Sequence, residues 1–343
     1  MRHPVPLIAA LAAVAMTAVG CGGASDSSSG AAASGATNAK TTLSLVAYST
    51  PQVVYDQLIP GFNKTAGGKG VAFKSSYGPS GDQSRAVEGG QKADYVAFSL
   101  QPDMQRLVDD KIVAPGWDAN ASKGFVSTSV VTFIVRKGNP KNIHTWDDLL
   151  KPGIEVLTPN PFSSGAAKWN MLAAIGAKGD GGKNLGAGLA YLKQLITKHV
   201  KVQDKSGRDA LQNFTSGTGD VLISYENEAI TAQKKGQDVD YVIPHDTIKI
   251  ENPVAVTKDA PPAAKAFEDY ALSPQGQQVF ADWGYRPVDA AVLAKNKSKF
   301  PDPKNLFTIQ DFGGWDKVNS ELFDVDKGKV AKIEADAGVS TAK

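Results

Sequence analysis

From Thr42 onward, the chain alternates short apolar segments of strand length with segments whose apolar residues recur at helical spacing. The first pair is TLSLVAY followed by PQVVYDQLIPGF, in which Pro51 suits the first position of a helix. GVAFKSSY and ADYVAFSL predict two further strands, and SGDQSRAVEGG between them predicts a helix ended by glycines. This alternation favours βαβ units, and therefore a mostly parallel sheet flanked by helices.

A second series of the same kind follows a longer predicted strand at residues 126–137. It includes the helix TWDDLL, the strand EVLTPNP, the helix SGAAKWNMLAAIGA and then NLGAGLAYLKQLITKH, whose leucines lie at helical spacing. A chain of 343 residues has room for roughly two domains. We therefore expect an α/β protein of two lobes with a cleft between them, where small ligands commonly bind.

The N-terminus differs in composition from the rest of the chain. A short basic start precedes an apolar stretch at residues 7–19, which is too short for a comfortable membrane span but fits the core of a secretory signal. The letters AVGC then resemble a bacterial lipobox and end at Cys21, the one cysteine in the sequence; the usual leucine is Ala18 here. We predict a signal peptide at residues 1–20 and a lipid on Cys21; the alternative is an ordinary signal with an incidental cysteine.

The segment that follows Cys21 is rich in glycine, alanine and serine and has almost nothing to bury. Residues 21–41 are therefore predicted to form a flexible tether. Together, signal, lipid and tether predict an exported domain anchored on the outer face of the cytoplasmic membrane, in the periplasmic space.

The charge pattern excludes several classes of function. The formal net charge is only +2 and no long basic run is present, which argues against nucleic-acid binding. None of the four histidines has the spacing of metal ligands, so we expect neither a metal nor a cofactor.

Three predicted strand-to-helix junctions share one design, a serine followed by small residues at the start of the helix. They lie at residues 80–81, 164–166 and 206–207. A helix N-terminus leaves backbone N–H groups without partners and adds roughly half a positive charge. Each junction can therefore bind an anion without a cationic side chain, although each alone also fits an ordinary serine cap. The motif YENEA contains two acidic residues, Glu226 and Glu228. We expect both to lie on a solvated helix start, with a contact between the lobes as the alternative.

Several longer motifs, in this order, closely resemble the periplasmic sulfate- and thiosulfate-binding proteins of ABC transporters: FIVRKGNPKNIHTWDDLLKPG, TPNPFSSGAAKWN, GDVLISYENEA, SPQGQQVFADWGYRP and LFTIQDFGGWDKVNSELF. The resemblance covers residues 43–324 and implies the type II two-lobe fold, with chain crossings near Thr132 and Asn252. It thus predicts lobe 1 at residues 42–131, lobe 2 at 132–251, and a return to lobe 1 with C-terminal helices at 252–343.

The resemblance also implies a set of binding residues. Members of the family hold dehydrated sulfate through backbone N–H groups, one serine hydroxyl and one tryptophan N–H. By position, the hydroxyl is that of Ser164, the tryptophan is replaced by Tyr225, and the backbone donors are Ser49, Ser80, Gly165, Ala166 and Gly207. Ser49 stands where the family pattern SYDPT has aspartate, and the motif GGSGKQ reads GPSGDQ here.

These features predict a binding protein rather than an enzyme, a monomer that captures sulfate or thiosulfate and delivers it to an ABC permease. A site for another tetrahedral oxyanion, such as molybdate or phosphate, is the first alternative. A secreted hydrolase that uses Ser164 or Ser80 is the second, although no histidine or lysine is positioned to activate either serine.

Overall fold

The computed structural model describes residues 40–342. The predicted signal peptide, Cys21 and nearly all of the predicted tether lie outside the described residues. The strands are β1 (Thr41–Tyr48), β2 (Val71–Gly78), β3 (Tyr95–Ala97), β4 (Phe125–Arg136), β5 (Val156–Pro159), β6 (Val200–Asp204), β7 (Val221–Tyr225), β8 (Val239–Val242), β9 (Asp246–Val256), β10 (Arg286–Pro287) and β11 (Asn305–Phe307).

One helix, α3, was not predicted from sequence patterns, and the helices after β9 were predicted only as a helical C-terminal part. The α-helices are α1 (Gln52–Phe62), α2 (Ser80–Glu88), α3 (Gln101–Asp109), α4 (Gly165–Lys178), α5 (Leu185–Lys198), α6 (Gly207–Thr215), α7 (Glu226–Lys234), α8 (Pro262–Leu272), α9 (Pro274–Asp282), α10 (Ala290–Lys295), α11 (Trp315–Val318) and α12 (Lys329–Asp336). Short 3₁₀ or π turns are η1 (Trp146–Leu150), η2 (Asp180–Gly182), η3 (Lys297–Lys299), η4 (Ile309–Phe312) and η5 (Asn319–Phe323). Within residues 40–342, no helix is long and apolar enough to span a bilayer.

The strands form one mixed sheet with the order β2-β1-β3-β9-β4-β7-β5-β6. β1 pairs in parallel with β2 and β3, and these strands define the β1 half. β5 pairs in parallel with β6 and β7, and these define the β5 half. The predicted α/β class with mostly parallel strands is confirmed.

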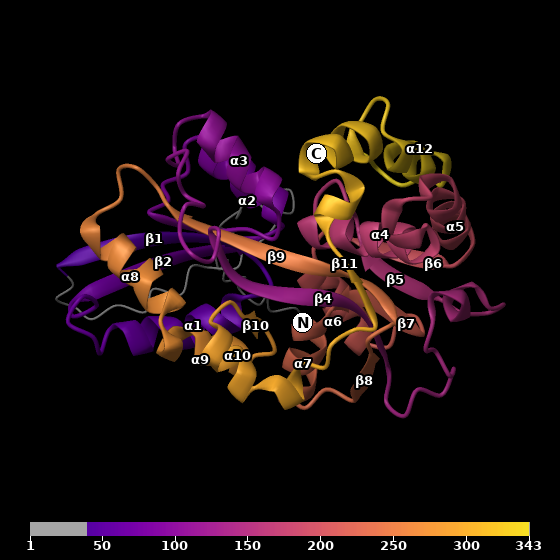
Figure 1. Ribbon diagram of the computed structural model, residues 1–343, viewed down its shortest axis with the longest axis horizontal. Coiled ribbons are helices and arrows are strands. Elements are labelled where there is room, and N and C mark those ends of the chain that lie inside the picture. The colour runs from indigo at the N-terminus through magenta and orange to yellow at the C-terminus, as the bar shows by residue number, and fades with distance from the viewer. Residues whose placement is uncertain (1–39, 343) are drawn as a thin grey trace, which may run out of the picture. The chain divides into compact units, whose positions relative to one another are not determined.

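Two long antiparallel strands, β4 and β9, connect the halves, as Figure 1 shows. β9 pairs with β3 at its C-terminal end, while β4 pairs with β9 through its first part and with β7 through its last. Each long strand therefore belongs to both halves, which is the arrangement that lets two halves move about a shared hinge.

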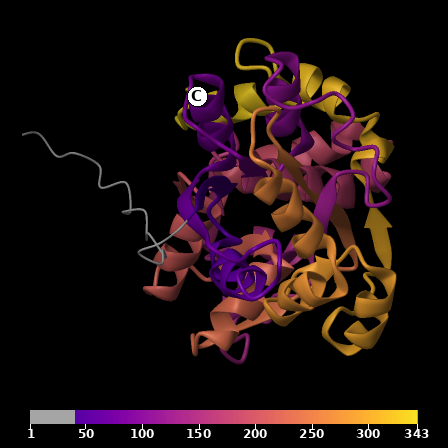
Figure 2. The same ribbon diagram turned by 90° about the vertical axis from the view of Figure 1, so that its left-hand side faces the viewer.

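Helices cover both faces of the β1 half. Helices α1, α8 and α9 lie on one face and α2 and α3 on the other, as the two ribbon views show (Figures 1 and 2). The first face buries Leu43, Leu45, Phe267 and Phe280, and the second buries Val46, Phe98 and Leu107, so the side chains of the strands alternate between two cores.

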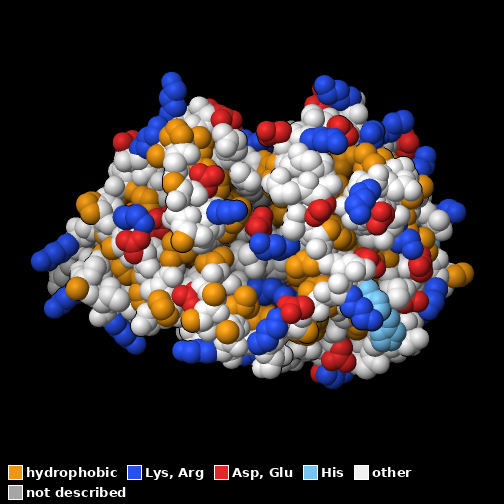
Figure 3. All heavy atoms as spheres, in the orientation of Figure 1, with side chains coloured by type: hydrophobic (Ala, Val, Ile, Leu, Met, Phe, Trp, Pro, Cys, Tyr) orange, Lys and Arg blue, Asp and Glu red, His pale blue; other side chains and the backbone are white. Residues whose placement is uncertain are grey.

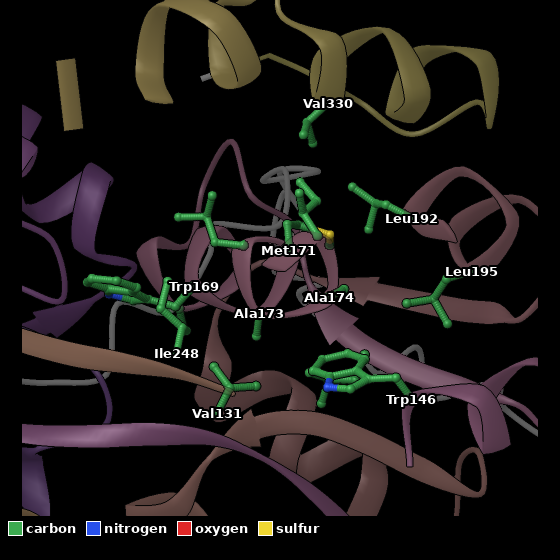
Figure 4. Close-up of a cluster of buried hydrophobic side chains, with 14 of the residues drawn as sticks. Val131, Trp146, Trp169, Met171, Ala173, Ala174, Leu192, Leu195, Ile248 and Val330 are labelled. Carbon is green, nitrogen blue, oxygen red and sulfur yellow. The ribbon is translucent and has the colours of Figure 1, made fainter. Parts of the chain in front are cut away.

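The β5 half is layered in the same way. α4, α5 and α12 enclose the larger core, where Met171 of α4 lies toward Leu192 of α5 and Val330 of α12 (Figure 4). On another side of α4, Trp169 packs edge to face with Trp315. α6 and α7 cover the opposite face through Ala210, Phe214 and Ala229. Because α4 is buried on nearly every side, it carries apolar residues all round rather than along one stripe.

The C-terminal segment packs differently from the sequence-based expectation. Residues 252–343 were expected to return to lobe 1, but Phe307, Trp315, Phe323 and Val330 lie in the core of the β5 half. The cause is β11, which pairs in parallel with the start of β9 and carries the chain to that half. Of the segment that was expected to return to lobe 1, only the part that contains α8 and α9 packs on the β1 half.

Candidate binding site

Three helices begin at the carboxyl ends of parallel strands. α2 follows β2, α4 follows β5 and α6 follows β6, and their lengths are 9, 14 and 9 residues. The carboxyl ends of parallel strands share one edge of a sheet, where α/β proteins commonly bind ligands. The first N–H groups of each helix have no partner within the helix. These helix starts correspond to the three junctions that the sequence singled out.

The serines at these junctions do not all act as caps. Ser206 is an ordinary N-cap, because its Oγ accepts a hydrogen bond of 3.1 Å from the N–H of Asp209. Ser164 occupies the same position before α4 but makes no capping bond, although it is only 4% exposed. The hydroxyl of Ser164 is therefore left for another acceptor.

Ser80 uses its hydroxyl within the protein. Its Oγ donates to Asp103 Oδ2 at 2.6 Å and accepts from the N–H of Ser99 at 3.0 Å. Burial raises the pKa of Asp103, while the Ser80 hydroxyl and nearby cations oppose that rise. What Ser80 can offer a ligand is consequently its backbone N–H, as the resemblance implied.

The structure brings the helix starts together across the two halves. A β-carbon at Gly165 would lie 2.0 Å from Ser99 Oγ, so α4 abuts the end of β3. A β-carbon at Gly207 would lie 3.5 Å from Thr50 and 3.6 Å from Ala166, which places the starts of α4 and α6 beside the loop after β1. The absence of a side chain at Gly165 is what permits the close approach to Ser99, whereas a β-carbon at Gly207 would make only ordinary van der Waals contacts.

Ser49 and Tyr225 complete the predicted set. Ser49 follows β1, and its carbonyl accepts a hydrogen bond of 2.6 Å from the guanidinium of Arg208, the second residue of α6. Tyr225 ends β7 and is fully buried, and burial raises the pKa of its hydroxyl well above the ordinary value, so the hydroxyl stays neutral. The seven residues thus lie at neighbouring positions where the two halves meet.

Ser99 and Arg208 are among the residues of this region that the sequence did not reveal. Ser99 touches Gly165, and its backbone carbonyl accepts a hydrogen bond of 2.8 Å from Trp169 Nε1. Arg208 connects the two halves through Ser49. Arg208 could have been suspected because it follows Gly207 directly, whereas Ser99 carries no local signal, since only packing between the halves brings it to α4.

The two glutamates at the start of α7 contradict the sequence-based expectation. Glu226 and Glu228 were predicted to lie on a solvated helix start, but their exposures are 0% and 3%. Arg286 pairs with Glu226 through two hydrogen bonds, of 2.6 and 3.0 Å, which compensates for burial of its charge. Burial raises the pKa of Glu228 to about 7, against the opposing effect of Arg208 and Lys235.

Two hollows lie beside the helix starts. The smaller, about 50 Å³, is lined by Ser164, Gly165 and Gly81, together with the cations Arg85, Arg106 and Lys168. The larger, about 1080 Å³, opens to solvent between α3 and the segment from η4 to η5, and it forms the hollow at the upper edge of Figure 3.

The larger hollow is the poorer candidate for binding an anion. Its acidic side chains outnumber its basic ones, Arg106 and Lys168; the acids are Glu88, Asp103, Asp109, Asp110, Asp316 and Asp324. Because Asp103, Arg106 and Lys168 line both hollows, the larger one leads to the helix starts and is best regarded as their approach from solvent.

The arrangement suits anion binding more than catalysis or metal binding. Within residues 40–342, no cluster of histidine, cysteine or acidic side chains could hold a metal ion. In the same part of the chain, no histidine forms a hydrogen bond with Ser80 or Ser164, as a serine nucleophile would require. The site offers neutral hydrogen-bond donors and the positive ends of helices, with the cations Arg85, Arg106 and Lys168 in the adjoining hollow.

Known proteins share both sequence and fold with this chain. Residues 43–286 match the family model described as bacterial extracellular solute-binding protein. A sulfate-binding protein of Synechococcus elongatus is 39% identical over 315 residues, covering 88% of each chain. A thiosulfate-binding protein of Escherichia coli is also 39% identical, covering 86% of this chain and 91% of its own length.

A solved structure of a known protein also shares the fold of this chain. The sulfate-binding protein SubI from Mycobacterium tuberculosis H37Rv is 51% identical, with a TM-score of 0.81, and the match covers 83% of this chain and all of that one. These relatives are binding proteins and not enzymes. The match of the family model to most of the chain, together with these identities, shows that the chain belongs to the bacterial extracellular solute-binding proteins.

Proposed function

We propose that this protein captures sulfate or thiosulfate outside the cytoplasmic membrane and delivers it to an ABC import permease. The observation that carries the proposal is the meeting of three helix N-termini at a buried point where Ser164 leaves its hydroxyl uncommitted. The relatives described above are named for binding these two anions, which narrows the class of ligand.

The protein groups that we propose to bind the anion are uncharged hydrogen-bond donors. The hydroxyls of Ser164 and Tyr225 and the backbone N–H groups of Ser49, Ser80, Gly165, Ala166 and Gly207 would surround the anion. Sulfate carries no proton at neutral pH and accepts hydrogen bonds on every oxygen. Helix ends supply partial positive charge without a counter-ion, so the anion can be held in a site that excludes water.

We further propose that closure of two lobes buries the anion. Lobe 1 would contain residues 42–131 and the return through α8 and α9, and lobe 2 would contain residues 132–251 and the segment from residue 305. The bond from Arg208 to Ser49 and that from Trp169 to Ser99 both connect the two halves, so they would form on closure.

Titration calorimetry with sulfate, thiosulfate, molybdate and phosphate tests the proposal on the mature chain. We expect micromolar or tighter binding of sulfate or thiosulfate, and weaker binding of the other two. Preference for molybdate or phosphate would assign the site to the alternative oxyanions. Binding of none of the four would refute the proposed function.

We also propose that the protein is a monomer held at the membrane by a lipid on Cys21, a residue outside the described part of the chain. The sequence pattern around Cys21 is the support for the anchor. Replacement of Cys21 by alanine should release the protein from the membrane fraction into the soluble fraction. Unchanged membrane association of that variant would exclude the lipid anchor.

A further inference from the structure

The side chain of Ser99 has no partner, although the rest of the residue is held in place. Ser99 is 0% exposed, and its Oγ forms no hydrogen bond with any residue in the range 40–342. Its N–H donates to Ser80 Oγ and its carbonyl accepts from Trp169 Nε1. A buried hydroxyl without a partner costs about 1–3 kcal/mol. The described residues contain several such hydroxyls, and that of Ser99 is distinguished by its place against the start of α4.

The hydroxyl of Ser99 lies against the start of α4. A β-carbon at Gly165 would be 2.0 Å from Ser99 Oγ, and the neighbouring Leu100 would be 2.8 Å away. The first N–H groups of α4 have no intrahelical acceptor. An unpaired hydroxyl and unpaired N–H groups therefore meet at one buried place.

A second buried hydroxyl without a partner lies beside the first. Tyr225 Oη is fully buried and forms no hydrogen bond within the described residues. Burial raises the pKa of Tyr225, and the Ser99 side chain is near enough to lower it somewhat. The two hydroxyls, one from each half, thus lie close to each other, although neither makes a hydrogen bond of normal geometry within the described residues.

We propose that Ser99 Oγ is a further ligand of the anion at the start of α4, and that Ser99 and Tyr225 act as a pair that sets anion preference. This inference rests on the proposed function. The resemblance predicts one indole N–H at the Tyr225 position, which only donates. The two hydroxyls supply two hydrogen-bond donors to a fully deprotonated tetrahedral oxyanion. Each hydroxyl can also accept a hydrogen bond from a protonated oxyanion.

The test compares two buried serines that differ in their hydrogen bonding. Ser99→Ala removes a hydroxyl without a partner, and Ser84→Ala removes one that donates to the Asp103 carbonyl at 2.6 Å; both residues are 0% exposed. We expect Ser99→Ala to weaken sulfate binding about 10-fold or more, without lowering the melting temperature of the ligand-free protein. Ser84→Ala should show the opposite pattern, a lower melting temperature and sulfate affinity within about threefold of wild type.

Ser99→Cys provides a second variant of similar volume, in which a weak S–H donor replaces the hydroxyl, and it should also bind sulfate less tightly. If the wild type binds sulfate and both Ser99 variants bind it equally well, the inference is wrong while the proposed function stands. A loss of ligand-free stability that accounts for the loss of affinity would assign Ser99 a structural role and overturn the inference as well. Absence of binding of sulfate and thiosulfate by the wild type would instead refute the proposed function.

Discussion

At the scale of single residues, Ser164 and Ser206 form a natural pair, since each precedes a helix whose start belongs to the site. Ser206 caps α6, whereas Ser164 leaves its hydroxyl unused by α4. A hydrogen bond to a charged group is worth about 1.5–3 kcal/mol, so we expect Ser164→Ala to weaken sulfate binding roughly 10- to 150-fold. Ser206→Ala should instead lower the free energy of unfolding by about 1 kcal/mol, and it should weaken sulfate binding less than Ser164→Ala does.

Calorimetry with sulfate and thermal unfolding of both variants separate these two roles. Equal affinity losses would mean that both serines only shape their helices. An unchanged affinity of Ser164→Ala would mean that the start of α4 does not bind the anion through that hydroxyl.

Tyr225 bears on discrimination between anions. Phosphate keeps at least one proton at neutral pH and needs an acceptor, and a site of pure donors rejects it because a buried unpaired group costs about 1–3 kcal/mol. A tyrosine hydroxyl can accept, but the aspartate of the family pattern is absent at Ser49, which removes a stronger acceptor. We therefore predict that sulfate binds more tightly than phosphate, by a smaller margin than a tryptophan site would give.

Competition titrations on the wild type and on Tyr225→Phe measure this margin. The phenylalanine variant should lose sulfate affinity, because one donor disappears while the ring remains. Sulfate affinity untouched by the change would remove Tyr225 from the site, and a wild-type preference for phosphate would contradict the assignment to sulfate.

At the scale of elements, the start of α7 depends on an ion pair distant in sequence. Arg286 of β10 binds Glu226 through two hydrogen bonds and also donates to the Pro301 carbonyl at 2.8 Å. Removing one partner of a buried pair leaves an uncompensated charge, so Arg286→Met should lower the free energy of unfolding by about 3–5 kcal/mol. The double variant with Glu226→Leu should recover part of this loss, because both charges are then gone.

Urea unfolding of the single and double variants measures the coupling between these two residues. A double variant no more stable than Arg286→Met would show that packing of the arginine, and not the pairing of charges, holds α7 in place.

At the scale of the whole molecule, Glu334 should make stability depend on pH. Glu334 of α12 is fully buried; its Oε2 accepts from Gln203 Nε2 at 2.7 Å, and its Oε1 has no partner within residues 40–342. Burial raises the pKa of this carboxyl to about 7 from a reference value of 4.5. The folded state therefore binds the proton more tightly than the unfolded chain does. The stabilisation of the folded state that comes from protonated Glu334 is complete below about pH 4.5. It is lost as the pH rises through 7, and it amounts to at most about 3 kcal/mol.

Glu334→Gln provides the comparison, because it keeps the shape and cannot ionise. We expect the free energies of unfolding of wild type and variant to be similar near pH 5, and the variant to be the more stable one at pH 8. Parallel stability curves from pH 5 to 8 would show that Glu334 stays ionised or is exposed in solution.

Much of the architecture was predictable because it depends on local patterns. Apolar alternation placed β1, β2, β4 and β5, and small residues after strands marked the starts of α2, α4 and α6. These signals lie within about ten residues of the features that they predict. The predicted helix TWDDLL forms the 3₁₀ turn η1 and β3 is only 3 residues long, since hydrogen-bond geometry at the ends of elements depends on neighbours as well as on propensity.

The sequence by itself determined the alternation of strands and helices, the helix starts that form the candidate site, and, through its motifs, the family. Only the tertiary structure decided that Glu226 is buried against Arg286, that the segment from residue 305 packs on the β5 half, and that Ser99 meets Gly165. The physical reason is the range of the interactions. Helix starts and strand patterns follow from backbone hydrogen bonding among near neighbours. These three contacts instead join residues about 60 or more positions apart, and their burial is settled only when distant segments of the chain pack together.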